Sequence, residues 1–96
     1  MLKIICQKQF TQSGDYTKKD IEIFNDCIQA GIKELKMDWR DPESEGIELI
    51  ETESELCFEL DERKIDFENM YDSMERIERD IMAVVNNYAI PFTIDR

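Results

Sequence analysis

The strongest pattern in the sequence is a stripe of apolar residues that recurs every three or four positions between Phe67 and Tyr88. The stripe consists of Phe67, Met70, Met74, Ile77, Ile81, Val84 and Tyr88. This spacing places every member on one face of an α-helix, so it predicts an amphipathic helix that must cover another apolar layer. Asp66 stands in the N-cap position, and Pro91 is expected to end the helix.

A second stripe of the same period predicts another helix, from Thr17 to about Met37. Its members are Ile21, Phe24, Ile28, Ile32 and Leu35. Thr17 is followed three residues later by Asp20, which resembles a capping box with Asp in place of Glu. Gly31 costs about 1 kcal/mol relative to Ala inside a helix, and we expect it to allow a close approach to the sheet.

Three other regions alternate with a period of two, the signature of half-buried strands. Residues 1–10 form the first, residues 47–60 form a hairpin with a turn near 52–54, and residues 90–94 form the last. The alternation collects one set of apolar side chains on the face that the helices would cover. This set is Leu2, Ile4, Ile47, Leu49, Leu56, Phe58, Leu60, Phe92 and Ile94.

The predicted elements follow the order β-α-β-β-α-β within a single domain, 1–96. Right-handed crossovers then favour an α+β, ferredoxin-like fold. The expected architecture is one antiparallel four-stranded sheet in the order 4-1-3-2, with two helices on one face.

Charge is concentrated in one region of the chain. The stretch from Asp41 to Glu62 carries ten carboxylates and no basic residue, and so accounts for −10 of the net charge of −11. A balance this acidic argues against nucleic acid or an anionic membrane as a direct partner and favours a basic protein. The alternative is a solvated edge that stays charged against aggregation.

The face opposite the helices would be left to solvent. We expect it to carry Lys3, Ile5, Gln7, Glu48, Ile50, Glu55, Cys57 and Glu59. Ile5, Ile50 and Cys57 would then form an apolar strip between rows of carboxylates, which is the common build of a protein interface. RNA-recognition domains share this topology but use aromatic and basic residues on this face, so RNA binding is disfavoured.

Twelve residues are therefore candidates for binding a partner. They are Glu43, Glu45, Glu48, Ile50, Glu51, Glu53, Glu55, Glu59, Asp61, Glu62, Ile5 and Trp39. Trp39 is the only tryptophan and begins the acidic loop, and tryptophan is enriched at binding hot spots. The alternative for Trp39 is a lid over the protein's own core.

The residues for common enzyme chemistry are missing from the sequence. The chain has no histidine, and its glycines at 14, 31 and 46 permit no phosphate-binding loop motif. Asp41, Glu43, Glu45 and Gly46 match the opening of a calcium loop, but Thr52 stands where a bidentate Glu is required. We therefore expect no enzyme activity, no cofactor and no dedicated metal site.

The cysteines and the hydropathy bear on location. The three cysteines, Cys6, Cys27 and Cys57, are odd in number and form no CxxC pair, which suits buried thiols in a reducing compartment. No apolar run has the length of a membrane helix, and no signal-peptide pattern begins the chain. These features predict a cytoplasmic protein.

In size, in its isolated-domain character and in the Asp41–Glu62 carboxylate run, the chain resembles the small acidic inhibitors that phages and mobile elements use against host defence. These are the anti-CRISPR proteins and the DNA mimics of the anti-restriction type. The resemblance implies a non-catalytic protein that occupies the nucleic-acid-binding surface of a bacterial nuclease or a CRISPR- or restriction-type defence complex. Its carboxylates would substitute for phosphates, and nucleic-acid access would be blocked.

Other functions remain open at this point. An immunity protein or antitoxin that neutralises a basic toxin would use the same physics on another target. A regulatory homo-oligomer, such as a homodimer, would pair through the edge strand or the open face of the sheet. A weak divalent-metal sensor would use the oxygen-rich loop.

Overall fold

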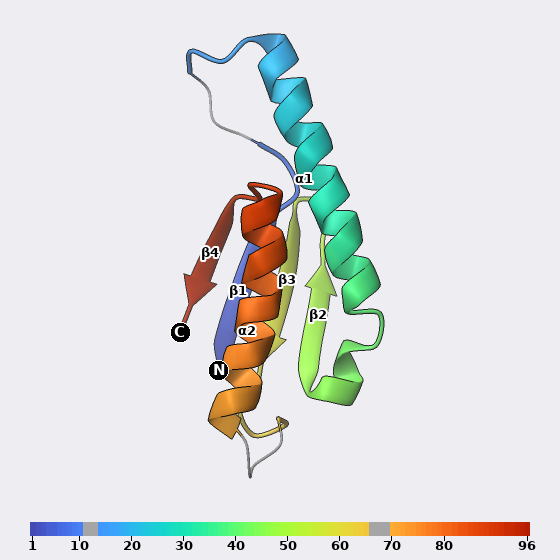
Figure 1. Ribbon diagram of the computed structural model, residues 1–96, viewed down its shortest axis with the longest axis vertical. Helices are drawn as coiled ribbons and strands as arrows, with labels where there is room; N and C mark the ends of the chain where they lie inside the picture. Colours follow the sequence, from blue (N-terminus) through green and yellow to red (C-terminus); the bar gives the residue numbers. More distant parts are fainter. Residues whose placement is uncertain (11–13, 66–69) are drawn as a thin grey trace.

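All four predicted strands and both predicted helices are present in the computed structural model, which describes residues 1–10, 14–65 and 70–96 (Figure 1). The strands are β1 (Leu2–Gln7), β2 (Ile47–Glu51), β3 (Glu55–Leu60) and β4 (Phe92–Asp95). The helices are α1 (Lys18–Asp38) and α2 (Met70–Asn87), and the short 3-10 helix η1 (Pro42–Glu45) precedes β2.

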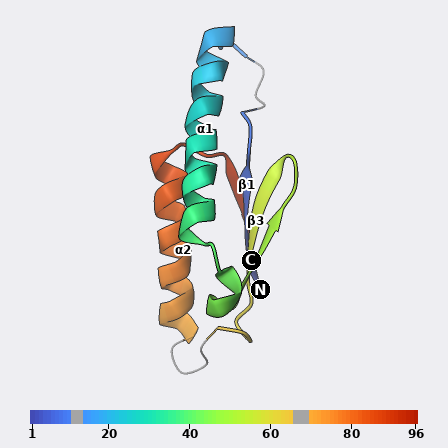
Figure 2. The same cartoon turned by 90° about the vertical axis from the view of Figure 1, so that its right-hand side faces the viewer.

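The sheet has the order β2-β3-β1-β4, and every pair of neighbouring strands is antiparallel. Both helices lie on the same side of this sheet, as Figure 2 shows edge-on. The predicted ferredoxin-like α+β fold is therefore confirmed, including the position of β2 at one edge and β4 at the other. In the parts of the chain that the structure describes, neither helix is long and apolar enough to cross a membrane.

The predicted capping box at the start of α1 is confirmed. The Asp20 backbone N–H donates to the Thr17 hydroxyl at 3.1 Å, and the Thr17 N–H donates to the Asp20 carboxylate at 3.2 Å. At the other end, the Trp39 N–H donates to the Leu35 carbonyl at 3.0 Å. The predicted N-cap of the second helix, Asp66, and the first residue of its stripe, Phe67, lie outside the described residues.

The core forms between the helices and the covered face of the sheet. Ile4, Leu56, Phe58 and Leu60 are completely buried there. The face assignment from the alternation is confirmed, but burial differs at the edge strand β4. Phe92 lies opposite Cys6 on the covered face and yet keeps 42% of its surface exposed. The reason is that β4 is an edge strand, with a neighbouring strand on one side only.

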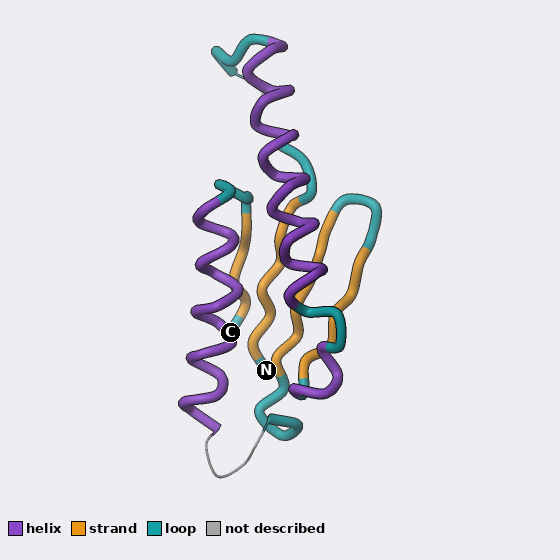
Figure 3. The backbone as a smooth tube through the Cα atoms, turned by 45° about the vertical axis from the view of Figure 1, so that its right-hand side comes forward, coloured by secondary structure: helices purple, strands orange, loops and turns teal. Residues whose placement is uncertain are grey.

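Only the C-terminal half of the predicted α1 stripe is buried. Ile28, Ile32 and Leu35 reach the core, whereas Phe24 is 37% exposed, because α1 runs well past the end of the sheet (Figure 3). Phe24 instead contacts the rings of Phe10 and Tyr16, with centroid separations of 5.1 and 5.5 Å. The molecule is consequently elongated, 50 × 23 × 22 Å.

Gly31 permits a close approach, but to a different neighbour from the one expected. A Cβ atom at Gly31 would lie 2.6 Å from Tyr88 Cβ and 2.7 Å from Ile90 Cδ1. Tyr88 and Ile90 follow α2 and lead into β4. The expectation of an approach to the sheet is therefore wrong: the close neighbours of Gly31 belong to the segment between α2 and β4.

Candidate functional site

The open face of the sheet carries an apolar row across its centre. The register pairs Ile50 with Cys57, Cys57 with Ile5, and Ile5 with Thr93, so one residue from each strand contributes. Directly opposed residues of antiparallel strands project to the same face. Ile50 is 39% exposed, and Ile5 and Cys57 are half-buried. The register thus brings together the predicted strip of Ile5, Ile50 and Cys57.

A charged row runs alongside the apolar row. It contains Glu48, Glu59, Lys3 and Asp95, again one residue from each strand. Lys3 Nζ lies 3.5 Å from Glu59 Oε1. Glu48 is the neighbour of Glu59 on the other side, so two carboxylates stand directly opposite each other on β2 and β3. This row has a net charge of −2.

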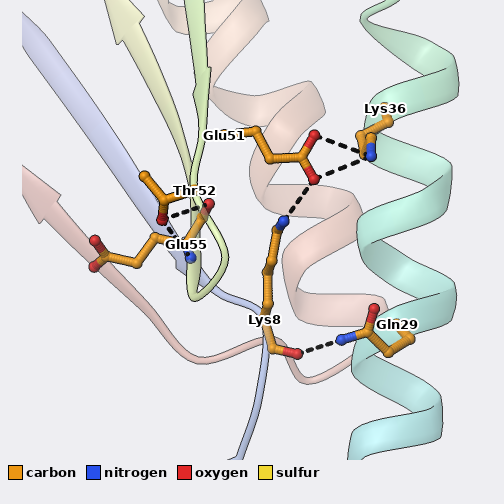
Figure 4. Close-up of polar contacts among 6 residues, drawn as sticks. All are labelled: Lys8, Gln29, Lys36, Glu51, Thr52 and Glu55. Carbon is orange, nitrogen blue, oxygen red and sulfur yellow. Dashed lines mark hydrogen bonds and ion pairs between the residues drawn. The ribbon is translucent and has the colours of Figure 1, made fainter.

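The other flank of the apolar row is polar and leads to the turn of the hairpin. Gln7 lies opposite Glu55, and the Gln7 amide donates to the Glu55 carboxylate at 3.0 Å. Thr52 closes the turn: its N–H donates to the Glu55 carbonyl at 2.9 Å. Its hydroxyl accepts from the Glu55 N–H at 3.0 Å, as Figure 4 shows. Glu53 is exposed at the tip of this turn.

Glu51 does not belong to the open face. It lies opposite Leu56 in the register, so its side chain projects to the side that the helices cover. There the Glu51 carboxylate accepts from Lys8 Nζ at 2.5 Å and from Lys36 Nζ at 3.0 Å (Figure 4). The hydrogen bonds from Lys8 and Lys36 lower the pKa of Glu51 below its ordinary value.

Two further carboxylates at the end of the hairpin are held by groups within the molecule. Asp61 is only 7% exposed, and it accepts from the Arg63 backbone N–H at 3.0 Å and from the Arg63 guanidinium at 3.1 Å. The Arg63 side chain accordingly lowers the pKa of Asp61. Glu62 lies 3.0 Å from the amino group of Met1. These carboxylates are partly neutralised before any partner arrives.

The remaining predicted residues are distributed elsewhere. Trp39 packs edge-on against the buried ring of Phe58, at a centroid separation of 6.4 Å, and therefore lies on the covered side of the sheet. Glu43 is exposed on η1. The side chain of Glu45 lies outside the described residues.

The thiol in the apolar row stays uncharged. Burial and the neighbouring Glu59 carboxylate raise the pKa of Cys57, and burial raises the pKa of Cys6 beneath it in the core to about 12. Cys57 therefore contributes a neutral, weakly polar surface at the centre of the open face. In the described part of the chain, no group of three or more His, Cys, Asp or Glu side chains is placed to hold a metal ion.

The predicted residue set missed the contribution of the last strand. Thr93 and Asp95 extend the apolar and the charged row on β4. Their positions follow from the alternation of β4, because Phe92 and Ile94 occupy the covered face. The complete site is thus an apolar row with four nearby carboxylates, Glu48, Glu55, Glu59 and Asp95, and one ammonium group, Lys3.

Comparison of the chain with protein-family models, with curated proteins and with solved structures finds no match. The geometry of the open face is therefore the basis for a functional assignment.

Proposed function

We propose that the open face of the sheet binds a basic protein surface and that the protein acts as a non-catalytic inhibitor. An apolar centre supplies contact that excludes water, and surrounding charges supply orientation and a fast approach. Ile5, Ile50 and Cys57 form the centre, and the carboxylates of Glu48 and Glu55 border it on two sides.

The observation that carries this proposal is the direct opposition of Glu48 and Glu59. Like charges opposed on neighbouring strands destabilise a sheet, by up to roughly 1 kcal/mol for a pair. Two carboxylates away from this face have internal cations: Glu51 has two lysines, and Asp61 has Arg63. Within the opposed pair, Lys3 serves Glu59 alone. Uncompensated charge is thus retained on the face that has apolar residues to bury.

The partner that fits this surface is a nucleic-acid-binding protein of a bacterial nuclease or defence complex. Lys and Arg side chains that normally contact phosphates would contact Glu48, Glu55 and Glu59 instead, and nucleic acid would be excluded by competition. The proposed surface is narrower than the whole Asp41–Glu62 stretch, because Glu51 and Asp61 are engaged inside the molecule. Trp39 is also excluded from it, because its ring packs against Phe58 on the covered side.

The test is affinity capture from a bacterial lysate, followed by elution with nucleic acid. We expect the immobilised protein to retain a nucleic-acid-binding protein at low salt, and we expect duplex DNA or RNA to displace it. Release by salt as well as by nucleic acid is expected because the contacts are ionic. A retained protein that nucleic acid does not displace would contradict competitive occlusion.

Two other results would redirect the assignment. If the immobilised protein retains only its own copies, the open face or the edge strand β2 is a homo-oligomeric interface. If nothing is retained, the carboxylates of the hairpin form a solvated edge.

A further inference from the structure

A cavity of about 280 Å³ lies on the covered side of the hairpin, between α1 and the end of β2. Four basic side chains line it, those of Lys8, Lys33, Lys36 and Arg40, whereas Glu51 is the only acidic residue among the described ones that line it. The lining therefore has a net charge of +3 in a protein whose net charge is −11. A third of the Lys and Arg residues of the chain gather at this one place.

Helical spacing explains how α1 contributes two of these cations. Lys33 and Lys36 are three positions apart and so share one face near the C-terminal end of α1, and Arg40 follows two residues after the helix ends. Acidic residues of the same turns face elsewhere: the Glu34 carboxylate is hydrogen-bonded to the Tyr88 side chain, and this bond raises the pKa of Tyr88. The Glu34 carboxylate is thereby held away from the cavity.

Lys8, which directly follows β1, completes the site and is held in place by its backbone. Its N–H donates to the Ser54 carbonyl at 2.9 Å, and its carbonyl accepts from the Gln29 side-chain amide at 2.5 Å (Figure 4). Only 15% of the Lys8 side chain is exposed. A nearly buried ammonium group on a fixed backbone is a preorganised anion contact.

Glu51 already occupies part of the site as an internal anion. Both Lys8 and Lys36 donate to one oxygen of its carboxylate, Oε2, which shows that a carboxylate-sized anion fits between the two lysines. These contacts of Glu51 with Lys8 and Lys36 form a clamp between the hairpin and α1, and the clamp needs only these two cations. The side chains of Lys33 and Arg40 take no part in this clamp, so the site has cations beyond those that the clamp uses.

We infer that this cavity binds a small phosphorylated molecule. Arg40 offers the planar fork that matches a phosphate, Lys33 and Lys36 offer point charges, and Ile32 with Met37 offers an apolar wall for an organic group. The C-terminal end of α1 contributes a partial charge of about −0.5, so the side chains and not the backbone must supply the attraction.

The ligand is small because the surroundings are acidic. A short anion samples mainly the charges within about 8 Å, the screening length at physiological ionic strength. A long nucleic-acid strand would also extend over the acidic hairpin and be repelled. This binding site is independent of the open face, which lies on the other side of the sheet.

The test is a calorimetric titration with inorganic tripolyphosphate at constant ionic strength without divalent metal. We expect saturable one-site binding by the full chain. Combined substitution K33E/R40E should weaken it by about tenfold or more, since it converts the lining from net positive to net negative. Glu51→Gln should strengthen it severalfold, because the internal competitor is removed.

The matched control is K18E/K19E, the same charge change at the opposite end of α1, where both lysines are exposed. We expect it to leave the affinity within about twofold. Equal losses in both double variants would overturn the site, because they would indicate overall charge alone. So would the absence of saturable binding, or tighter binding of a single-stranded oligonucleotide than of tripolyphosphate. Circular dichroism confirms that each variant is folded.

Discussion

Glu48 and Glu59 stand directly opposite each other on neighbouring strands of the open face, and Lys3 approaches Glu59 from the other side. Glu59 thus has a partner, whereas Glu48 has only a like charge beside it in this row. The opposition costs stability in the free protein, and it gives the face a carboxylate that a basic partner can bind.

Glu48→Lys should therefore stabilise the free protein while it weakens partner binding. Replacing a like-charge pair with an opposite-charge pair is expected to raise the free energy of unfolding by roughly 0.5–1 kcal/mol. Urea denaturation measures this change. Glu22→Lys on α1 makes the same change in net charge at an exposed position, and it should alter stability by less than half as much. Loss of stability in Glu48→Lys would contradict the role of the opposed pair.

The three thiols should react with a thiol reagent in a fixed order at mildly alkaline pH. Cys27 is exposed and should react first. Cys57 should follow slowly, because its raised pKa leaves little thiolate, and Cys6 should react only on unfolding. Mass spectrometry of the labelled peptides gives the order. If Cys57 is labelled as fast as Cys27, the apolar row is more exposed to solvent than it is in the structure.

Gly31→Ala should destabilise the protein even though alanine is the better helix former. The added Cβ would come within 2.6 Å of Tyr88 Cβ, so the contact between α1 and the end of α2 must open. We expect a loss of about 1–3 kcal/mol in the free energy of unfolding.

Ala30→Gly, at the exposed neighbouring position, reports the intrinsic propensity difference and should cost about 1 kcal/mol. If Gly31→Ala instead gains the amount that Ala30→Gly loses, the close approach of Tyr88 is refuted.

Glu51→Gln should change how stability depends on pH. Folding lowers the pKa of Glu51 below its ordinary value of 4.5, so its contribution is present above pH 4.5 and disappears as the pH falls through the folded value. The variant should therefore lose roughly 0.5–1 kcal/mol at neutral pH and approach the stability of the unmodified protein in acid. Urea denaturation over a pH series measures the difference.

Glu53→Gln is the matched control for this series, because Glu53 is exposed at the tip of the same hairpin. The free energy of unfolding of this variant should differ from that of the unmodified protein by the same amount at every pH. If the free energy of unfolding of Glu51→Gln also differs from that of the unmodified protein by the same amount at every pH, the lysine contacts of Glu51 add nothing to stability.

The spacing at which apolar residues recur along the sequence was sufficient to predict the fold. Period-two alternation and helical stripes identify the four strands, the two α-helices and their covered faces, because burial on one side is what creates those patterns. The length of α1 beyond the sheet could not be predicted. Phe24 continues the stripe as if it were buried, and only the three-dimensional structure places it against Phe10 and Tyr16 instead.

The composition of the proposed binding face was predicted in part. The strip of Ile5, Ile50 and Cys57 follows from alternation and strand order, and the same parity puts Glu51 beside Leu49 on the covered side. Charge density along the chain does not reveal which carboxylates have internal partners. The contact between Lys8 and Glu51 joins residues 43 positions apart, and it depends on how the hairpin packs against α1.

The central claim is that the open face is the contact surface, and comparative capture by two charge variants tests it most directly. E48K/E55K reverses charge on the open face, and E22K/E75K makes the same change on the helices. We expect the first to lose the retained nucleic-acid-binding protein and the second to keep it, with Cys57 protected from labelling in the retained complex. Equal retention by both variants, with Cys57 still labelled, would contradict the account.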